Sequence, residues 1–208
     1  MVALGDIPHG MAWDEAAIGY NGYSIAHTGR DEWLKKLPIS FRSFGDYKAP
    51  LAIYINGAST LVFGVSLFAI RLPFALAGVG AVVGVMGLIY LLWEEWQSTP
   101  PATRFPQLTP PTAALLAGFF IAVSPWHIHY SRIGFESGMA LSFLIWSVVG
   151  FVLSMRKNLS RKYALFFIAI SAVCAAASLY TYHSSKITTP IVLSLLVLLQ
   201  WSNVKKNL

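Results

Sequence analysis

Long apolar runs without internal charge divide this chain into segments of the length that crosses a lipid bilayer. A crossing helix needs about 20 apolar residues, with aromatic residues at the interfaces and basic residues on the cytoplasmic side. Five runs fit this pattern, at positions 72–93, 112–126, 137–155, 163–180 and 187–201. The second and fifth are short, and interfacial Trp and Tyr or local thinning of the bilayer would accommodate them. The pattern predicts an all-α, polytopic membrane protein with about five transmembrane helices.

A sixth apolar stretch, 51–70, contains polar residues and two glycines, so it either spans the membrane or lies in its interface. The basic loop at 156–162 and the basic tail at 205–206 have no acids near them, which places both in the cytoplasm by the positive-inside rule. Counting spans back from them puts 126–136 outside and 94–111 inside. If 51–70 does not cross, the first fifty residues are also outside; if it crosses, they are cytoplasmic.

The first fifty residues hold six of the nine acids and five bases, a near balance that gives the positive-inside rule no preference. The sequence opens without the basic and apolar regions of a secretory signal peptide. An outside start then requires an anchor helix before it, and the chain stops just after a span. We therefore expect a fragment that lacks a preceding anchor helix and a carboxyl-terminal portion. Its two parts are an extracytoplasmic loop with juxtamembrane helices at 1–70 and a transmembrane bundle at 71–208.

Composition agrees with a membrane location, since 56% of the residues are hydrophobic, 12% are charged and the mean hydropathy is +0.59. Soluble domains carry about a quarter charged residues, so a soluble enzyme is excluded. The net charge of +6 comes from basic residues scattered between apolar runs, which does not favour a nucleic-acid partner. The single cysteine, Cys174, lies inside an apolar run, so neither a disulfide framework nor a cysteine metal site is expected. A transporter would need ionisable residues within the spans, and 72–93 and the runs from 137 onward contain none.

Four polar clusters lie outside the apolar runs. In the first, Asp14 and Glu15 open a helix-patterned segment that ends near Gly29. These acids either only cap the helix and complement its dipole, or supply a base or a cation ligand. In the second, Lys48 stands before an apolar stretch, where its ammonium either snorkels to the interface or meets a lipid phosphate.

The third cluster, 124–136, contains Arg132 and Glu136 at i, i+4 spacing. On one helix these two residues would form a mutual ion pair worth a few tenths of a kcal/mol. A zinc site built from His127 and His129 is an alternative interpretation of the same segment.

The fourth cluster contains Lys186 with Tyr182 and His183. These residues either add hydrogen-bond donors to an anionic group or anchor the chain at the membrane interface. A single topology brings all four clusters to the same face of the membrane, which separate structural roles would not require. This common placement favours a functional interpretation of the clusters.

The order of these motifs resembles a known family of membrane enzymes. Together they are similar to the amino-terminal half of the dolichyl-phosphate-mannose protein mannosyltransferase and aminoarabinose transferase superfamily, which are glycosyltransferases of the GT-C fold. The resemblance covers nearly the whole chain and implies that 51–70 is interfacial. It rests on Asp14-Glu15, Leu37-Pro38, Gly45-Asp46-Tyr47-Lys48-Ala49-Pro50-Leu51, Phe63-Gly64, Arg71-Leu72-Pro73, Ser124-Pro125-Trp126, Ser131-Arg132 and Tyr180-Thr181-Tyr182 with Lys186.

The resemblance implies transfer of a sugar from a polyprenyl-phosphate donor to an acceptor hydroxyl, with inversion, at the outer face of the membrane. In such a reaction a carboxylate accepts the hydroxyl proton while cations hold the leaving phosphate. A divalent cation, Mg²⁺ or Mn²⁺, beside the carboxylates is a candidate cofactor, and members of the family differ in their use of metal. The implied site consists of the catalytic residues Asp14 and Glu15, the donor phosphate-binding residues Lys48, Arg132 and Lys186, and the candidate second acid Glu136.

Two positions depart from the family pattern, because Ala49 stands where proline is common and Glu136 where aspartate is common. The alternative function is a non-catalytic membrane protein that binds lipid carriers or takes part in envelope assembly. The motifs look bacterial, which favours a multi-pass protein of the plasma membrane with its site facing outside. Expected partners are a polyprenyl-phosphate-linked sugar, membrane lipids and an acceptor, whether protein, lipid or glycan.

Overall fold

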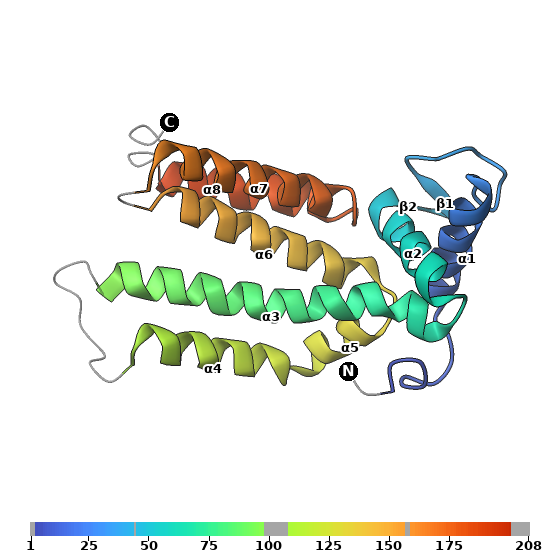
Figure 1. Cartoon of the computed structure of the whole chain (residues 1–208), viewed down its shortest axis with the longest axis horizontal. Helices are drawn as coiled ribbons and strands as arrows, with labels where there is room; N and C mark the ends of the chain where they lie inside the picture. The colour runs from blue at the N-terminus through green and yellow to red at the C-terminus, as the bar shows by residue number, and fades with distance from the viewer. Residues whose placement is uncertain (1–2, 44, 98–107, 157–158, 201–208) are drawn as a thin grey trace.

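A computed structural model describes residues 3–43, 45–97, 108–156 and 159–200 of the chain. Five helices, α3, α4, α6, α7 and α8, run side by side as an elongated bundle, and α1, α2, α5 and a small hairpin gather at one end of it (Figure 1). In chain order the elements are α1 (Trp13–Thr28), β1 (Phe41–Ser43), β2 (Asp46–Lys48), α2 (Pro50–Phe63), α3 (Leu67–Gln97), α4 (Pro110–Ala122), α5 (Pro125–Arg132), α6 (Glu136–Ser154), α7 (Arg161–Leu179) and α8 (Ser185–Leu199).

Three helices within the described ranges are long and apolar enough to cross a membrane: Leu67–Trp96 within α3, Glu136–Ser154 and Arg161–Leu179. They coincide with the predicted segments 72–93, 137–155 and 163–180, whose role as membrane spans stays a prediction. The fifth predicted segment, 187–201, corresponds to α8, a shorter apolar helix of 15 residues. The predicted end of that segment at 201 lies outside the described residues.

The predicted segment 112–126 is not one continuous helix in the structure, because it divides between α4 and α5, which meet at an angle of 63°. The cause is local: Pro125 has no N–H group, and the residue before it, Ser124, is extended with ψ of 123°. By length and composition the described part of the chain therefore has three spans, or four if this bent pair counts as one.

Helix α6 packs on α7 through small residues, as is typical of helices in membranes. The hydroxyl of Ser147 donates to the carbonyl of Ser171 at 2.9 Å, and the hydroxyl of Ser171 donates back to the carbonyl of Ser147 at 2.7 Å. Nearby, a Cβ on Gly150 would lie 3.1 Å from the Phe167 carbonyl oxygen. This close packing holds the cluster at the start of α6 in a fixed relation to the turn between α7 and α8.

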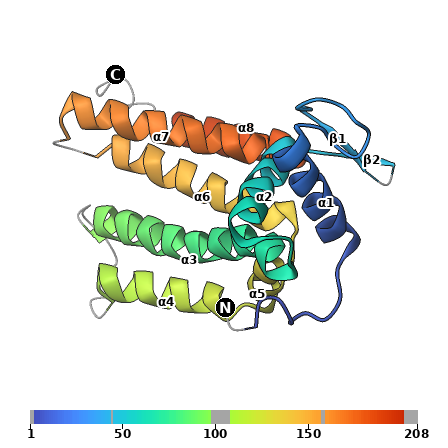
Figure 2. The same cartoon turned by 45° about the vertical axis from the view of Figure 1, so that its right-hand side comes forward.

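The sequence correctly predicts α1, including its end at Gly29, which has a left-handed φ of 68°. The helix does not begin as the capping interpretation suggested, because its N-cap is Ala12 and Asp14 lies within the first turn. Helix α1 lies against α2 (Figure 2). They cross at Gly22 and Gly57, where a Cβ on Gly22 would come within 2.9 Å of the Gly57 nitrogen. Two glycines thus permit this close crossing.

The apolar stretch 51–70 forms α2 and the first turn of α3, separated by a break at Gly64. Helix α2 has 14 residues, fewer than a membrane crossing needs, and its place in the interface stays a prediction. It is joined to α3 where Pro73 lacks the N–H that would bond the Ala69 carbonyl in the helix. The Ser59 hydroxyl donates to that carbonyl at 2.6 Å instead, which fixes the start of α3 against α2.

The strands form an antiparallel hairpin in which Phe41 pairs with Lys48. Its turn includes Gly45, whose φ of 83° lies in the left-handed region that glycine adopts without strain. The Leu51 N–H donates to the Tyr180 carbonyl at 3.0 Å, so the hairpin and α2 are held to the turn between α7 and α8. The hairpin therefore delivers Lys48 to the end of the bundle where α1 and α6 begin.

Candidate active site

The Lys48 ammonium lies between two carboxylates from different helices. It forms a salt bridge and a short hydrogen bond with Asp14 of α1, and its Nζ lies 3.5 Å from Oε1 of Glu136, the first residue of α6. The Lys48 and Glu136 side chains are 9% and 5% exposed, whereas Asp14 is 38% exposed. Lys48 and Glu136 are therefore buried within the cluster, whereas the Asp14 carboxylate is exposed enough for a substrate to reach it.

The environment of Lys48 favours its charged form. Burial alone would lower the pKa of this ammonium, but the hydrogen bond that it donates to Asp14 and the charges of Glu136 and Asp14 outweigh that effect. The pKa of Lys48 is therefore raised above its ordinary value. A lysine whose surroundings favour the charged form suits a group that holds an anion, and it is a poor candidate for a general base.

A cavity of about 230 Å³ opens beside this cluster. It lies where α1, β2, the start of α6 and the turn between α7 and α8 meet, and an aromatic contact between Phe135 and Tyr182, with ring centroids 6.2 Å apart, closes one side. It is lined by Asp14, Asp46, Tyr47, Lys48, Ala49, Phe135, Glu136, Thr181, Tyr182 and His183. Each of the four sequence clusters thus contributes to this cavity. The residues are Asp14 of the first, Lys48 of the second, Glu136 of the third, and Tyr182 and His183 of the fourth.

Glu15 faces away from this cavity and pairs with Arg71 near the start of α3. Its carboxylate accepts hydrogen bonds from Arg71 Nε at 2.7 Å and Nη2 at 3.1 Å, and from the Ala12 and Gly134 N–H groups at 2.9 Å each. Glu15 is 1% exposed and Arg71 is fully buried. Burial alone would raise the pKa of Glu15, but these hydrogen bonds and the Arg71 charge lower it overall. The Glu15 carboxylate therefore has a structural role, in which it binds the Arg71 side chain and the backbone at Ala12 and Gly134.

Arg132 and Lys186 lie outside the cavity that Lys48 lines. Arg132 closes α5, and its guanidinium donates to the Ile7 carbonyl at 2.9 Å and to the Ala3 carbonyl at 3.3 Å. Lys186 lines a neighbouring cavity of about 540 Å³, with its ammonium 3.4 Å from Nδ1 of His183. The His183 ring borders both cavities and bonds the Tyr47 carbonyl through Nε2.

The expected one-turn spacing of Arg132 and Glu136 is wrong. Arg132 ends α5 and Glu136 begins α6, with Ile133 and Phe135 both extended between them. The two side chains are consequently not on one helix, and Glu136 pairs with Lys48.

The carboxylates as arranged do not fit a divalent cation, because the Lys48 ammonium lies between Asp14 and Glu136 and the Glu15 oxygens bond Arg71. Across the described ranges no group of three or more His, Cys, Asp or Glu side chains is placed to hold a metal ion. His127, a candidate zinc ligand, bonds the Gly78 carbonyl through Nε2 at 3.1 Å. A divalent cation at this site stays a prediction.

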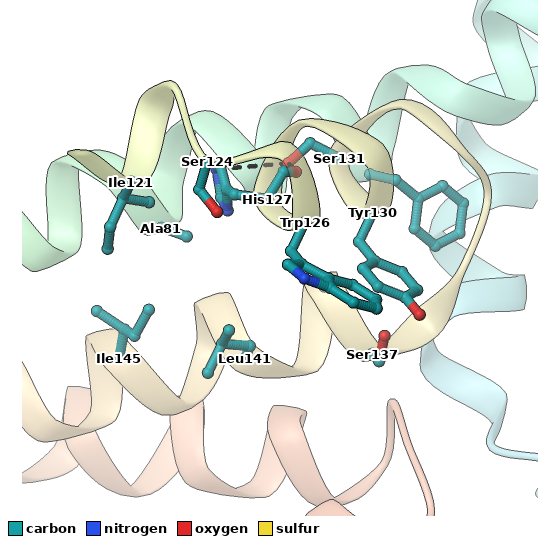
Figure 3. Close-up of a pocket in the computed structure, with 12 residues that line it drawn as sticks. Ala81, Ile121, Ser124, Trp126, His127, Tyr130, Ser131, Ser137, Leu141 and Ile145 are labelled. Carbon is teal, nitrogen blue, oxygen red and sulfur yellow. Dashed lines mark hydrogen bonds between the residues drawn. The ribbon is translucent and has the colours of Figure 1, made fainter. Parts of the chain in front are cut away.

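A third, mainly apolar cavity of about 350 Å³ lies between α3, α5 and α6 (Figure 3). On the α5 side, Trp126 and Tyr130 stack with ring centroids 5.9 Å apart and an interplanar angle of 10°. Across from them, α6 presents Ser137, Leu141 and Ile145 (Figure 3). Because Ser137 directly follows Glu136, this cavity and the Lys48 cavity border the same end of α6.

The role of Arg71 was not predicted from the sequence, where this residue was only part of a motif. The signal was present, since Arg71 is a lone arginine at the start of a long apolar run. An ionisable residue in that place is costly unless it is paired, so it marks a partner elsewhere. Gly134, whose N–H bonds Glu15, carried no comparable signal.

The fold is all-α and that of a polytopic membrane protein of the GT-C type. Two crystal structures of ArnT from Cupriavidus metallidurans share it. The apo structure matches 97% of this chain with a TM-score of 0.69, and the structure bound to undecaprenyl phosphate matches 99% with a TM-score of 0.72, both at 15% identity. The chain spans 35% of the length of each ArnT chain. No protein-family profile and no curated protein sequence matches it.

Proposed function

We propose that this chain belongs to a glycosyltransferase that moves a sugar from a polyprenyl-phosphate donor to an acceptor hydroxyl, with inversion. The observation that carries the proposal is the Asp14–Lys48–Glu136 cluster, which lines a cavity at one end of a GT-C-type bundle. The likeness to ArnT supports it, because one ArnT structure is bound to undecaprenyl phosphate, a lipid of the proposed donor class.

In the proposed reaction Asp14 is the base. Its carboxylate accepts the proton of the acceptor hydroxyl as the hydroxyl oxygen attacks the anomeric carbon. The bond between that carbon and the donor phosphate oxygen breaks, and polyprenyl phosphate leaves with the electron pair. Asp14 suits this role because it is the most exposed member of the cluster.

Lys48 holds the phosphate in this scheme. Its raised pKa keeps the ammonium charged, and charge placed where the leaving group develops its own charge stabilises the transition state. A donor phosphate that contacts Lys48 competes with Asp14 for the same ammonium. Donor binding therefore frees the Asp14 carboxylate to act as a base. Arg132 and Lys186 are further phosphate ligands only if the donor extends beyond the Lys48 cavity.

The apolar cavity beside α5 suits the first prenyl units of the donor. It borders the same end of α6 as the phosphate site, and its walls are mainly aromatic and aliphatic. A phosphate at Lys48 would leave the attached hydrocarbon close to Trp126 and Leu141. Burial of that hydrocarbon would contribute about 0.8 kcal/mol per CH₂ group to donor binding.

The protein, purified at its full natural length, provides the test. Native mass spectrometry measures binding of undecaprenyl phosphate, and lipid mass spectrometry follows conversion of polyprenyl-phosphoryl sugars in a membrane lipid extract. We expect Asp14→Asn to lower turnover by about 10²–10⁴-fold with donor binding retained. We expect Lys48→Ala to weaken binding of undecaprenyl phosphate as well.

Two matched controls separate these effects from a general change in charge. Asp6→Asn removes an exposed acid, and Lys162→Ala removes an exposed base at the start of α7. Both should behave as the wild type. Binding of undecaprenyl phosphate without any sugar turnover would overturn the transferase proposal in favour of a non-catalytic carrier-binding protein. Full turnover by Asp14→Asn would overturn the role of Asp14.

A further inference from the structure

Arg71 has every hydrogen-bonding group satisfied in a fully buried position. A guanidinium has five N–H donors, and those of Arg71 reach five acceptors. Nε and one Nη2 donor bond the Glu15 carboxylate, and the remaining three reach backbone carbonyls of the amino-terminal segment. These carbonyls belong to Leu4 at 3.1 Å, Pro8 at 3.0 Å and Gly10 at 2.8 Å.

Glu15 completes this network from the other side. Its two oxygens accept four hydrogen bonds, two from Arg71, one from the Ala12 N–H and one from the Gly134 N–H. Glu15 therefore joins the first turn of α1, the start of α3 and the corner between α5 and α6. With four bonds made and 1% exposure, its carboxylate is closed to a substrate.

Two cluster residues sit immediately beside these fixed points. Asp14 precedes Glu15 on the first turn of α1, and Glu136 lies two positions after Gly134. The separation of Asp14 from Glu136 is thus set by the same carboxylate, and Lys48 bridges that separation.

We propose that Glu15 and Arg71 are a positioning pair that holds Asp14 and Glu136 on either side of Lys48. The pair acts on the reaction only through these residues, so its catalytic consequence rests on the proposed function. Its structural consequence, the burial of Lys48 between two carboxylates, does not rest on that function. This role departs from the direct catalytic role that the sequence suggested for Glu15.

The readout is the reactivity of the Lys48 amine in the full-length protein, measured against pH with a small acylating reagent and peptide mass spectrometry. Only the neutral amine reacts, so the profile reports the environment of Lys48. The charged and titratable groups that face it are Asp14 from α1, Asp46 and Tyr47 from β2, Glu136 from α6, and Tyr182 and His183 from the turn before α8. None of these residues is altered in the test variants.

Three variants loosen the pair. Glu15→Gln removes the charge, and Arg71→Lys replaces a planar fork by a single ammonium that cannot reach all five acceptors. Gly134→Ala is the mildest, because its added Cβ would lie 3.0 Å from Cγ of Glu15 and 3.4 Å from the Phe74 ring. The matched control is Glu94→Gln, which breaks an exposed ion pair with Arg156 near the carboxyl ends of α3 and α6.

We expect Lys48 to become about tenfold more reactive at a given pH for each unit by which its pKa falls, in all three variants and not in the control. Unchanged Lys48 reactivity in Gly134→Ala and Glu15→Gln, with the wild-type elution volume in size-exclusion chromatography, would overturn the proposal. If Glu15→Gln or Arg71→Lys fails to fold, the pH profile of Lys48 reactivity in Gly134→Ala alone decides whether the proposal stands. A shifted Lys48 profile in a protein without sugar turnover would sustain the positioning pair and reject the proposed function instead.

Discussion

The Lys48 ammonium lies 3.5 Å from the Glu136 carboxylate, and both side chains are more than nine-tenths buried. A buried carboxylate that loses its cation keeps the cost of its own desolvation, so breaking such a pair from one side is expensive. Loss of the contact between Lys48 and Glu136 should therefore lower the free energy of unfolding as well as the activity.

Replacing Lys48 by methionine should destabilise the folded protein by about 3–5 kcal/mol, because the buried Glu136 carboxylate loses its cationic partner. The double variant Lys48→Met with Glu136→Gln should recover part of this loss, since no buried charge remains. Thermal unfolding in detergent, followed by tryptophan fluorescence, compares the two. A double variant that is less stable than Lys48→Met would contradict the buried pair.

Acid should abolish the stabilisation that Glu15 provides. The pKa of Glu15 in the folded protein is below its ordinary value of 4.5. A carboxyl of this kind stabilises the folded state above its unfolded pKa, and the contribution disappears as the pH falls through the folded pKa. The difference in unfolding temperature between wild type and Glu15→Gln should thus be largest near neutral pH and shrink below pH 4.5. A difference that stays constant into acid would reject the anionic role of Glu15.

Much of the fold follows from hydrophobic runs alone, because a membrane span is defined by length and the absence of charge. The segments at 72–93, 137–155 and 163–180 coincide with helices, and Gly29 ends α1 as expected. The bend between α4 and α5 was missed because the apolar run continues across it. Only the backbone restriction at Pro125 reveals the break.

Only part of the candidate site could be predicted from the sequence. Topology brought Asp14, Lys48 and Glu136 to one end, and the structure places them in contact. The separation of Glu15 from its neighbour Asp14 was not predictable, since it depends on which way each side chain faces in the first turn of α1. That direction is set by Arg71, fifty-six positions away, through a contact that local patterns do not encode.

The two lysines of the predicted phosphate site should act independently. Lys48 lines one cavity and pairs with Asp14 and Glu136, whereas Lys186 lines a neighbouring cavity and contacts His183. We expect the losses of undecaprenyl phosphate affinity in Lys48→Ala and Lys186→Ala to add within about 0.5 kcal/mol in the double variant. A coupling energy well above that would place both ammonium groups on one phosphate.

Filling the apolar cavity beside α5 should affect donor binding more than turnover. Leu141→Trp replaces a leucine side chain by a larger indole ring among Trp126, Tyr130 and Ile145, where the proposed prenyl chain lies. We expect KM for the donor to rise and kcat to stay near the wild-type value, because uniform binding is lost and no transition-state contact is removed. Leu195→Trp, on an exposed position of α8, is the control. A fall in kcat without a change in KM would count against a lipid chain in this cavity.

The end of the bundle that carries the Lys48 cluster should face the outside of the cell. In a Cys174→Ala background, single cysteines at the exposed positions His9 and Ser184 report that end, and one at exposed Ser160 reports the other, before α7. The predicted topology requires a membrane-impermeant thiol reagent to label positions 9 and 184 in intact cells and to label position 160 only after the membrane is opened. Labelling of 160 in intact cells with protection of 9 and 184 would reverse the topology and move the proposed chemistry to the cytoplasm. Labelling of 9 and 184 from opposite sides would separate α1 from the turn before α8, which is incompatible with the contact between Tyr47 and His183.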